Sequence, residues 1–221
     1  MKDFIDVRRI TKQYETAKAL NNVSLTIPEG SLTAIVGKSG CGKTTLLNMI
    51  GGLDTPSCGE VYVTGKCITA MKERELSRFR ADSIGFVFQF FDLVPEFTAA
   101  ENILLPQVLS RKQVDREHYS RLISVLGIGD FENRLPSELS GGEQQRVAIA
   151  RSLIRKPRLV LMDEPTGNLD ENNTEIVRSL IRRLRDDFGM TVVYVTHDRH
   201  MAEAADTVIS MRDGVIGDMP S

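Results

Sequence analysis

Apolar residues follow two periods along the chain, and stretches with the two periods alternate. Residues 4–27 alternate between apolar and polar, which predicts β-strands, and Pro28-Glu29-Gly30 then turns the chain. The apolar run 32–36 predicts a buried strand. Apolar residues at helix spacing follow Lys43 and stop at Gly51-Gly52, where glycine favours the end of a helix. Strands that alternate with helices predict an α/β fold.

The rest of the chain divides into a helical middle and a second set of strands. From residue 90 to 155 the pattern is helical, and its clearest helix is expected at 116–126. The other expected elements are strands at 60–63, 83–88, 159–162 and 191–195, a hairpin at 208–216 and a helix at 173–188. We expect a single domain over residues 1–221. Its core, 1–88 and 156–221, includes an N-terminal antiparallel β subdomain, and a helical subdomain is inserted at 89–155.

Composition and charge narrow the function classes. The 221 residues suffice for one domain, and 41% hydrophobic with 26% charged residues is typical of a globular protein. A net charge of −2 does not favour a general nucleic-acid binder. Apolar runs are shorter than the ~18 residues of a membrane span, and charges in residues 1–6 argue against a signal peptide. Three cysteines favour a reducing compartment over a disulfide framework.

The strongest motif lies between the predicted strand 32–36 and the helix that follows it. Glycines there let backbone N–H groups surround a phosphate, and the helix N-terminus adds positive potential. Lys43 can reach the β- and γ-phosphates, and the Thr44 hydroxyl can ligate Mg²⁺. These residues predict an ATP site with Mg²⁺. The predicted phosphate-binding residues are Gly37, Lys38, Ser39, Gly40, Cys41, Gly42, Lys43, Thr44 and Thr45.

A second candidate follows the apolar run 159–162, which ends in Asp163-Glu164. Many parallel strands end in an acidic residue, so this pair alone could be a solvated strand end. Beside a phosphate loop, Asp163 can hold Mg²⁺ through water, and Glu164 can polarise the water that attacks the γ-phosphate.

A third motif opens a predicted helix with the residues Leu139-Ser140-Gly141-Gly142-Glu143. Ser140 and Glu143 form a capping box, which is a sufficient structural explanation for the helix start. Two glycines in a first turn nevertheless cost helix stability. They make sense where a phosphate approaches the backbone.

Together these motifs resemble those of the ATP-binding-cassette (ABC) ATPases, and the resemblance covers nearly the whole chain. It implies a P-loop NTPase (RecA-like) core, with the motif at Ser140 carried on the helical subdomain. It also implies a head-to-tail dimer of two copies that holds two ATP. Ser140, Gly141 and Gly142 would then meet the γ-phosphate bound to the partner, with Ser140 and Gly142 as the expected contacts.

Other positions match the family in order. The resemblance implies that Tyr14, expected upstream of the first β segment, stacks on adenine, although an ordinary strand aromatic is the alternative. It implies that Gln89 senses Mg²⁺ and the attacking water, that Asp170 links the two active sites, and that His197 lies near the γ-phosphate. A histidine that ends a buried parallel strand also lies where ligands bind.

Three further residues carry expectations of their own. Cys41 stands where many relatives have serine, and a thiol beside phosphate, lysine and a helix N-terminus is expected to react with alkylating reagents. His118 and His200 match no functional position and are expected at the surface.

What the ATPase drives is open to three interpretations: a transporter motor, an ABC ATPase that acts on DNA or ribosomes, or a nucleotide-gated module without turnover. The stretch from Lys43 to Ser140 is too short for the long coiled coils or metal fingers of DNA-acting relatives, and the chain has one cassette where ribosome-acting relatives usually have two. A full set of hydrolytic residues disfavours the module without turnover.

The transporter interpretation draws on the segment after Gln89, which the family uses to contact a short helix of its permease. Phe90, Phe91, Leu93 and Phe97 can form an apolar groove there, and packing within the helical lobe is the alternative. The runs 53–56 and 165–170 resemble the subgroup of lipoprotein-release, macrolide-export and cell-division ATPases. This implies an integral membrane permease as partner, no nucleic acid, and attachment through the permease to the cytoplasmic face of the inner membrane.

Overall fold

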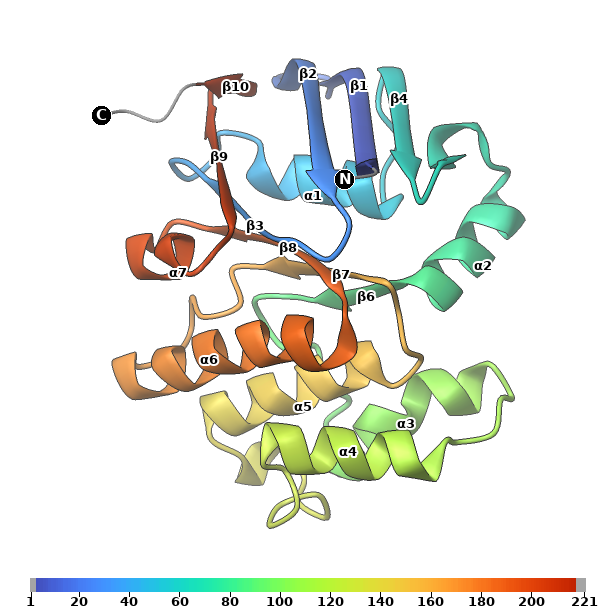
Figure 1. The fold of residues 1–221 in the computed structure, drawn as a ribbon, viewed down its shortest axis with the longest axis vertical. Helices are drawn as coiled ribbons and strands as arrows, with labels where there is room; N and C mark the ends of the chain where they lie inside the picture. The colour runs from blue at the N-terminus through green and yellow to red at the C-terminus, as the bar shows by residue number, and fades with distance from the viewer. Residues whose placement is uncertain (1–2, 218–221) are drawn as a thin grey trace.

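The computed structural model describes residues 3–217 as two sheets with helices between and beyond them (Figure 1). Residues 1–2 and 218–221, which include part of the charged N-terminal segment and both ends of the predicted core, lie outside the described residues. Within residues 3–217, no helix combines the length and apolar character that crossing a bilayer requires.

The larger sheet has the strand order β10-β9-β3-β8-β7-β6, and all neighbours are parallel except the pair β9 and β10. β3, β7 and β8 are buried over nearly their whole length, because helices or the second sheet cover both faces. Burial on both faces explains why these strands are mostly apolar and do not alternate with charged residues. The strands are β3 (Leu32–Val36), β6 (Ile84–Val87), β7 (Leu159–Asp163), β8 (Thr191–Thr196), β9 (Thr207–Arg212) and β10 (Val215–Gly217).

The smaller sheet is antiparallel and has the order β2-β1-β4-β5. Its strands are β1 (Asp3–Gln13), β2 (Lys18–Pro28), β4 (Cys58–Val63) and β5 (Lys66–Cys67). Alternate apolar residues of β1 and β2 share one core cluster with helix α1 (Lys43–Gly51) and with Ile35 and Val195 of the large sheet. α1 is therefore enclosed between the two sheets, as Figure 1 shows.

The opposite face of the large sheet carries α5 (Gly141–Leu153) and α6 (Glu171–Phe188), and α3 (Ala99–Leu109) and α4 (Arg116–Leu126) lie beyond α5 (Figure 1). The predicted bounds of the helix at 116–126 are confirmed. Two helices were not predicted, α2 (Glu73–Ser83) and α7 (Arg199–Glu203). α2 is highly charged and buries only Phe79, while α7 has five residues, so neither carries a clear apolar period.

One surface assignment is wrong. His118 on α4 is buried, with its Nε2 3.0 Å from the carbonyl oxygen of Leu153 and its ring edge-on to Phe188. The polar bond that offsets its burial comes from a helix end 35 residues away, which the local pattern does not contain. His200 is exposed, as expected.

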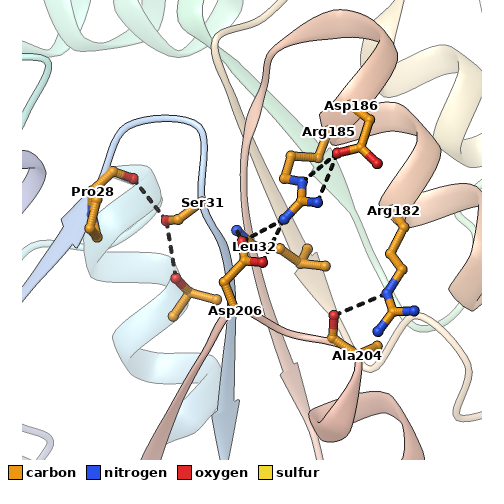
Figure 2. Close-up of polar contacts among 9 residues, drawn as sticks. Pro28, Ser31, Leu32, Arg182, Arg185, Asp186, Ala204 and Asp206 are labelled. Atoms are coloured by element: carbon orange, nitrogen blue, oxygen red, sulfur yellow. Dashed lines mark hydrogen bonds and ion pairs between the residues drawn. The ribbon is translucent and has the colours of Figure 1, made fainter. Parts of the chain in front are cut away.

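A polar junction holds the amino end of β3, opposite the end that carries the phosphate loop (Figure 2). Asp206 Oδ2 accepts the Leu32 N–H at 2.7 Å, and Arg185 of α6 donates to both oxygens of Asp206 at 2.6 Å. Burial raises the pKa of Asp206, but the Arg185 and Leu32 bonds outweigh it and leave this pKa below its usual value. The junction fixes β3, β9 and α6 relative to one another.

Candidate active site

The carboxyl ends of β3, β7 and β8 meet at one edge of the large sheet and border a cavity of about 510 Å³. This is the edge at which parallel α/β sheets bind ligands. The lining consists of Ala19, Ser39, Gly40, Gly42, Lys43, Thr44, Thr45, Gln89, Asp163, Glu164 and His197. A larger hollow of about 990 Å³ lies on the antiparallel sheet, but among the described residues its lining includes none of the predicted site residues.

The loop between β3 and α1 has the geometry of an anion cradle. Gly42 precedes α1 with φ 102°, and a Cβ there would lie 2.4 Å from the carbonyl oxygen of Ala19, so only glycine fits. No described side chain caps the start of α1, which leaves its first N–H groups to a ligand. Lys43 Nζ donates to the carbonyls of Gly37 at 2.9 Å and Lys38 at 3.2 Å, which holds the ammonium inside the loop.

Asp163 and Glu164 face different partners. The Thr44 hydroxyl donates to Asp163 Oδ1 at 3.1 Å. Burial raises the pKa of Asp163 above its usual value; the Thr44 bond opposes this shift, and the charge of Glu164 adds to it. Two carboxylates beside a phosphate site form a locally negative wall, which favours a cation.

Glu164 has a positive φ of 45°, an uncommon conformation that turns its side chain out of the strand direction. Its backbone N–H donates to the carbonyl of Val195 at 3.0 Å, and its Oε2 lies 2.9 Å from His197 Nδ1. The ends of β7 and β8 thus pair Glu164 with His197, the histidine expected near the γ-phosphate.

Gln89 reaches the cavity from the end of β6, and its carbonyl accepts the Asn168 side-chain N–H at 2.8 Å. Asn168 lies within the run 165–170, and no sequence motif predicts this contact for it. The contact between Asn168 and Gln89 follows from the fold, because β6 and β7 are neighbouring strands and the loops after them touch.

Tyr14 follows β1, so its expected place upstream of the first strand is wrong. Its hydroxyl donates to Asp54 at 2.9 Å, and Lys12 Nζ lies 5.0 Å from the ring centroid. Burial and then Asp54 raise the pKa of Tyr14, while the hydroxyl of Thr45, a residue of the cavity lining, lowers it. Tyr14 itself is 44% exposed and is not among the lining residues.

The third motif lies outside this cavity. Ser140 caps α5: its Oγ accepts the Glu143 N–H at 3.3 Å, and its own N–H donates to Glu143 Oε2 at 2.8 Å. Ser140 is exposed and Gly142 is buried. A Cβ on Gly142 would lie 2.0 Å from Oδ1 of Asn173, so packing against α6 already requires this glycine without any phosphate.

Asp170 also lies outside the lining, where it caps α6 by accepting the Asn173 N–H at 2.8 Å. The Cys41 side chain points into the core between the two sheets and is only 6% exposed. The expectation of a reactive thiol beside phosphate is therefore wrong, because the loop turns its backbone to the cavity and the side chain away from it.

Comparison with known proteins agrees with these observations. The family model for ABC transporter matches residues 20–167. The lipoprotein-releasing system ATP-binding protein LolD of Bacteroides thetaiotaomicron is 45% identical over 215 residues, which cover 96% of this chain and 98% of that protein. The macrolide export ATP-binding/permease protein MacB of Rhodopirellula baltica is 41% identical, but the match covers 90% of this chain and 30% of MacB.

Solved structures give the same result. The dimeric structure of MJ0796, a bacterial ABC transporter cassette, has a TM-score of 0.87 and 41% identity, with 97% of each chain covered. A post-hydrolysis MJ0796 dimer bound to ADP and Pi has a TM-score of 0.87 and 40% identity. The predicted fold class and the family resemblance are confirmed, and the findings support a transporter ATPase over one that acts on DNA. The chain belongs to the ABC transporter family, and it is an ATP-binding subunit that hydrolyses ATP.

Proposed function

We propose that this chain binds ATP with Mg²⁺ in the 510 Å³ cavity and works as a head-to-tail homodimer that drives a membrane permease. The observation that carries the proposal is the meeting of a phosphate loop, the Thr44–Asp163 contact and the Glu164–His197 pair in one cavity. In this assignment Lys43 and the loop backbone hold the β- and γ-phosphates, and Tyr14 stacks on the adenine.

The residues present fit Mg²⁺, which is bound in such sites by few protein oxygens together with phosphate and water. The Thr44 hydroxyl, the Asp163 carboxylate and the Gln89 side-chain oxygen are the ligands that we assign. The raised pKa of Asp163 supports the fit, because a nearby cation would favour its charged form. When bound, Mg²⁺ would neutralise charge on the phosphate oxygens.

We assign to Glu164 the role of polarising the water that attacks the γ-phosphate. His197 engages one carboxylate oxygen, Oε2, which orients the group and leaves Oε1 for a hydrogen bond from water. His197 stands at the same edge of the sheet and would steady the γ-phosphate. Closure of the site would exclude other water and leave this one in line with the phosphorus.

The dimer follows from the position of the third motif. Ser140 is exposed at the start of α5, yet it does not line the cavity of its own chain. In the proposed dimer, Ser140, Gly141 and Gly142 close on the γ-phosphate of the partner, and Asp170 lies where the two sites meet. The dimers reported for MJ0796 support this arrangement. Residues 89–155 are proposed to be the subdomain that carries this motif toward the partner.

The proposed permease contact is an apolar hollow of about 530 Å³ between α2, β6, α3 and α5. Of the four residues predicted to form the groove, none is among its lining, and Leu93 packs against the helical lobe. The apolar lining instead includes Ile84, Phe86, Phe88, Pro106 and Leu109. Within this lining Leu109 is 76% exposed, and so exposed an apolar side chain favours a protein partner.

A short permease helix is the occupant that we propose for this hollow, and it would hold the chain at the cytoplasmic face of the inner membrane. The names of the relatives favour a permease of the lipoprotein-releasing or macrolide-exporting kind. Leu109→Asp tests this contact, because Leu109 is remote from the ATP cavity. The variant should keep its ATPase activity and lose co-purification of a polytopic membrane protein; retained co-purification would refute the docking site.

Glu164→Gln tests the catalytic assignment. We expect ATP affinity to be kept, hydrolysis to fall by about 10²–10⁴-fold, the usual contribution of a positioned base, and a closed dimer to accumulate with ATP. Glu203→Gln is the matched control, since Glu203 is an exposed carboxylate whose Oε2 lies 3.7 Å from His200 Nδ1, and it does not line the cavity. Steady-state hydrolysis and sedimentation measure both effects. Hydrolysis by Glu164→Gln at the rate of the control would exclude Glu164 as the base.

A further inference from the structure

The backbone immediately after Gln89 is strained. Phe91 and Asp92 have φ values of 56° and 49°, the left-handed region that side chains other than glycine seldom occupy. The Asp92 N–H turns back to the carbonyl of Phe90 at 2.5 Å. Two consecutive residues in this conformation persist only where surrounding groups hold them.

The holding group is Arg151, which projects from α5. One guanidinium nitrogen donates to the Asp92 carbonyl at 2.6 Å, and the other donates to the Phe91 carbonyl at 2.7 Å. A planar guanidinium can satisfy two adjacent carbonyls at once, and such charge-assisted bonds are among the stronger ones. On the other side, Asn168 donates to the carbonyl of Gln89 at 2.8 Å. The backbone of residues 89–92 is therefore held by hydrogen bonds from two places, α5 and the loop after β7.

Arg151 and Ser140 stand on the same helix. Ser140 caps α5 at its start, and Arg151 lies eleven positions later, which is about 16 Å along a rigid α-helix. A shift of Gln89 along the cavity would be transmitted through the two carbonyls to α5. A tilt of α5 would in turn move Ser140 at the opposite end of the helix.

We infer that Arg151 is a positioning residue that ties the placement of Gln89 in one ATP site to the orientation of Ser140, which serves the other. The inference rests on the proposed roles of Gln89 and Ser140. Arg151 touches neither nucleotide nor Mg²⁺ in this assignment, and it acts only through the backbone that it holds. Asn168, in the loop after Glu164, provides the second hydrogen-bonding contact to this backbone.

Arg151→Lys and Arg151→Gln test the inference in the purified full chain. Lysine carries one ammonium and cannot span both carbonyls, so kcat should fall about tenfold, the effect of losing one charged hydrogen bond, and further in the glutamine variant. KM for ATP should stay unchanged, because the phosphate loop is untouched. In a Glu164→Gln background at saturating ATP, either change should raise the protein concentration at which the dimer forms.

Arg121→Lys is the matched control, since Arg121 on α4 also donates to a backbone carbonyl, that of Asp187 at 2.9 Å, remote from the cavity. A merely structural role would lower urea stability without separating kcat from KM. If the Arg151 variants fail to fold, Asn168→Ala replaces them in the test. Asn168 is exposed, and its replacement by alanine removes the hydrogen bond to the Gln89 carbonyl. The same fall in kcat at constant KM is expected.

Wild-type kcat and wild-type dimerisation in any folded variant of Arg151 or Asn168 would overturn the inference and leave the proposed function intact. The proposed function is tested separately by Lys43→Ala, whose ATP affinity is measured by equilibrium binding. Loss of binding in that variant supports the nucleotide site whatever the Arg151 variants do. Retained binding would remove the site assignment and the inference with it.

Discussion

Replacement of Gly142 by alanine separates the two explanations for the paired glycines at the start of α5. The added Cβ would lie 2.0 Å from Oδ1, 2.4 Å from Cγ and 3.0 Å from Cβ of Asn173. Rotation of Asn173 would break its side-chain N–H bond to Asp170 Oδ2 at 2.8 Å and would not move its Cβ, which stays at 3.0 Å. Gly141→Ala is the matched control, because its nearest atom, Cδ2 of Leu169, is at an ordinary 3.5 Å.

The expected magnitude follows from two opposing effects. Overpacking costs about 1–3 kcal/mol, and alanine in place of glycine in a helix returns up to about 1 kcal/mol. Gly142→Ala should therefore lower the free energy of unfolding by up to about 3 kcal/mol, which for a chain of this size is a fall in Tm of up to about 12 °C. Gly141→Ala should be neutral or stabilising by up to about 1 kcal/mol.

Urea unfolding of the nucleotide-free chain measures both changes. Adding Asn173→Ala to Gly142→Ala should restore part of the loss, with a coupling of at least about 0.5 kcal/mol in a double-mutant cycle. Equal stabilities for the two alanine variants, or a coupling near zero, would refute intrachain packing as the reason for Gly142. If the double variant regains stability but hydrolyses no ATP, the glycine has a second role at the partner's phosphate.

Two more predictions concern side chains that do not line the cavity. Exposed Cys58 should react with a maleimide in the native chain, while buried Cys41 should react only as fast as the chain opens, measured by mass spectrometry; equal rates would contradict this burial. Lys156 and then the His118 backbone N–H hold the pKa of Asp115 at about 2, below 3.8. The stability lost in Asp115→Asn should be full above pH 3.8 and vanish as pH falls through about 2; a difference constant with pH would contradict the assignment.

The phosphate loop and the Asp163-Glu164 pair could be predicted from sequence because both follow buried parallel strands. An apolar run that ends in a glycine-rich or acidic segment places those residues at the ligand-binding edge of the sheet, whichever strand lies beside it. Most predicted residues of the cavity accordingly meet there. Roles that depend on a partner chain, as for Ser140 and Asp170, remain predictions.

The residues that the motifs missed, Arg151, Asn168 and Asn173, share a physical cause. Each acts on backbone or on a glycine of a segment at least thirty residues away, so no local period or spacing records it. The contact of Asn168 with Gln89 joins the loops after β6 and β7, and the sequence pattern does not show that these strands are neighbours. The local sequence does not show why Gly142 is a glycine, because the atoms that a Cβ would meet belong to Asn173 on α6, a helix packed against α5. Sequence motifs therefore predict the residues that contact the ligand. The residues that position those motifs are found only in the folded structure.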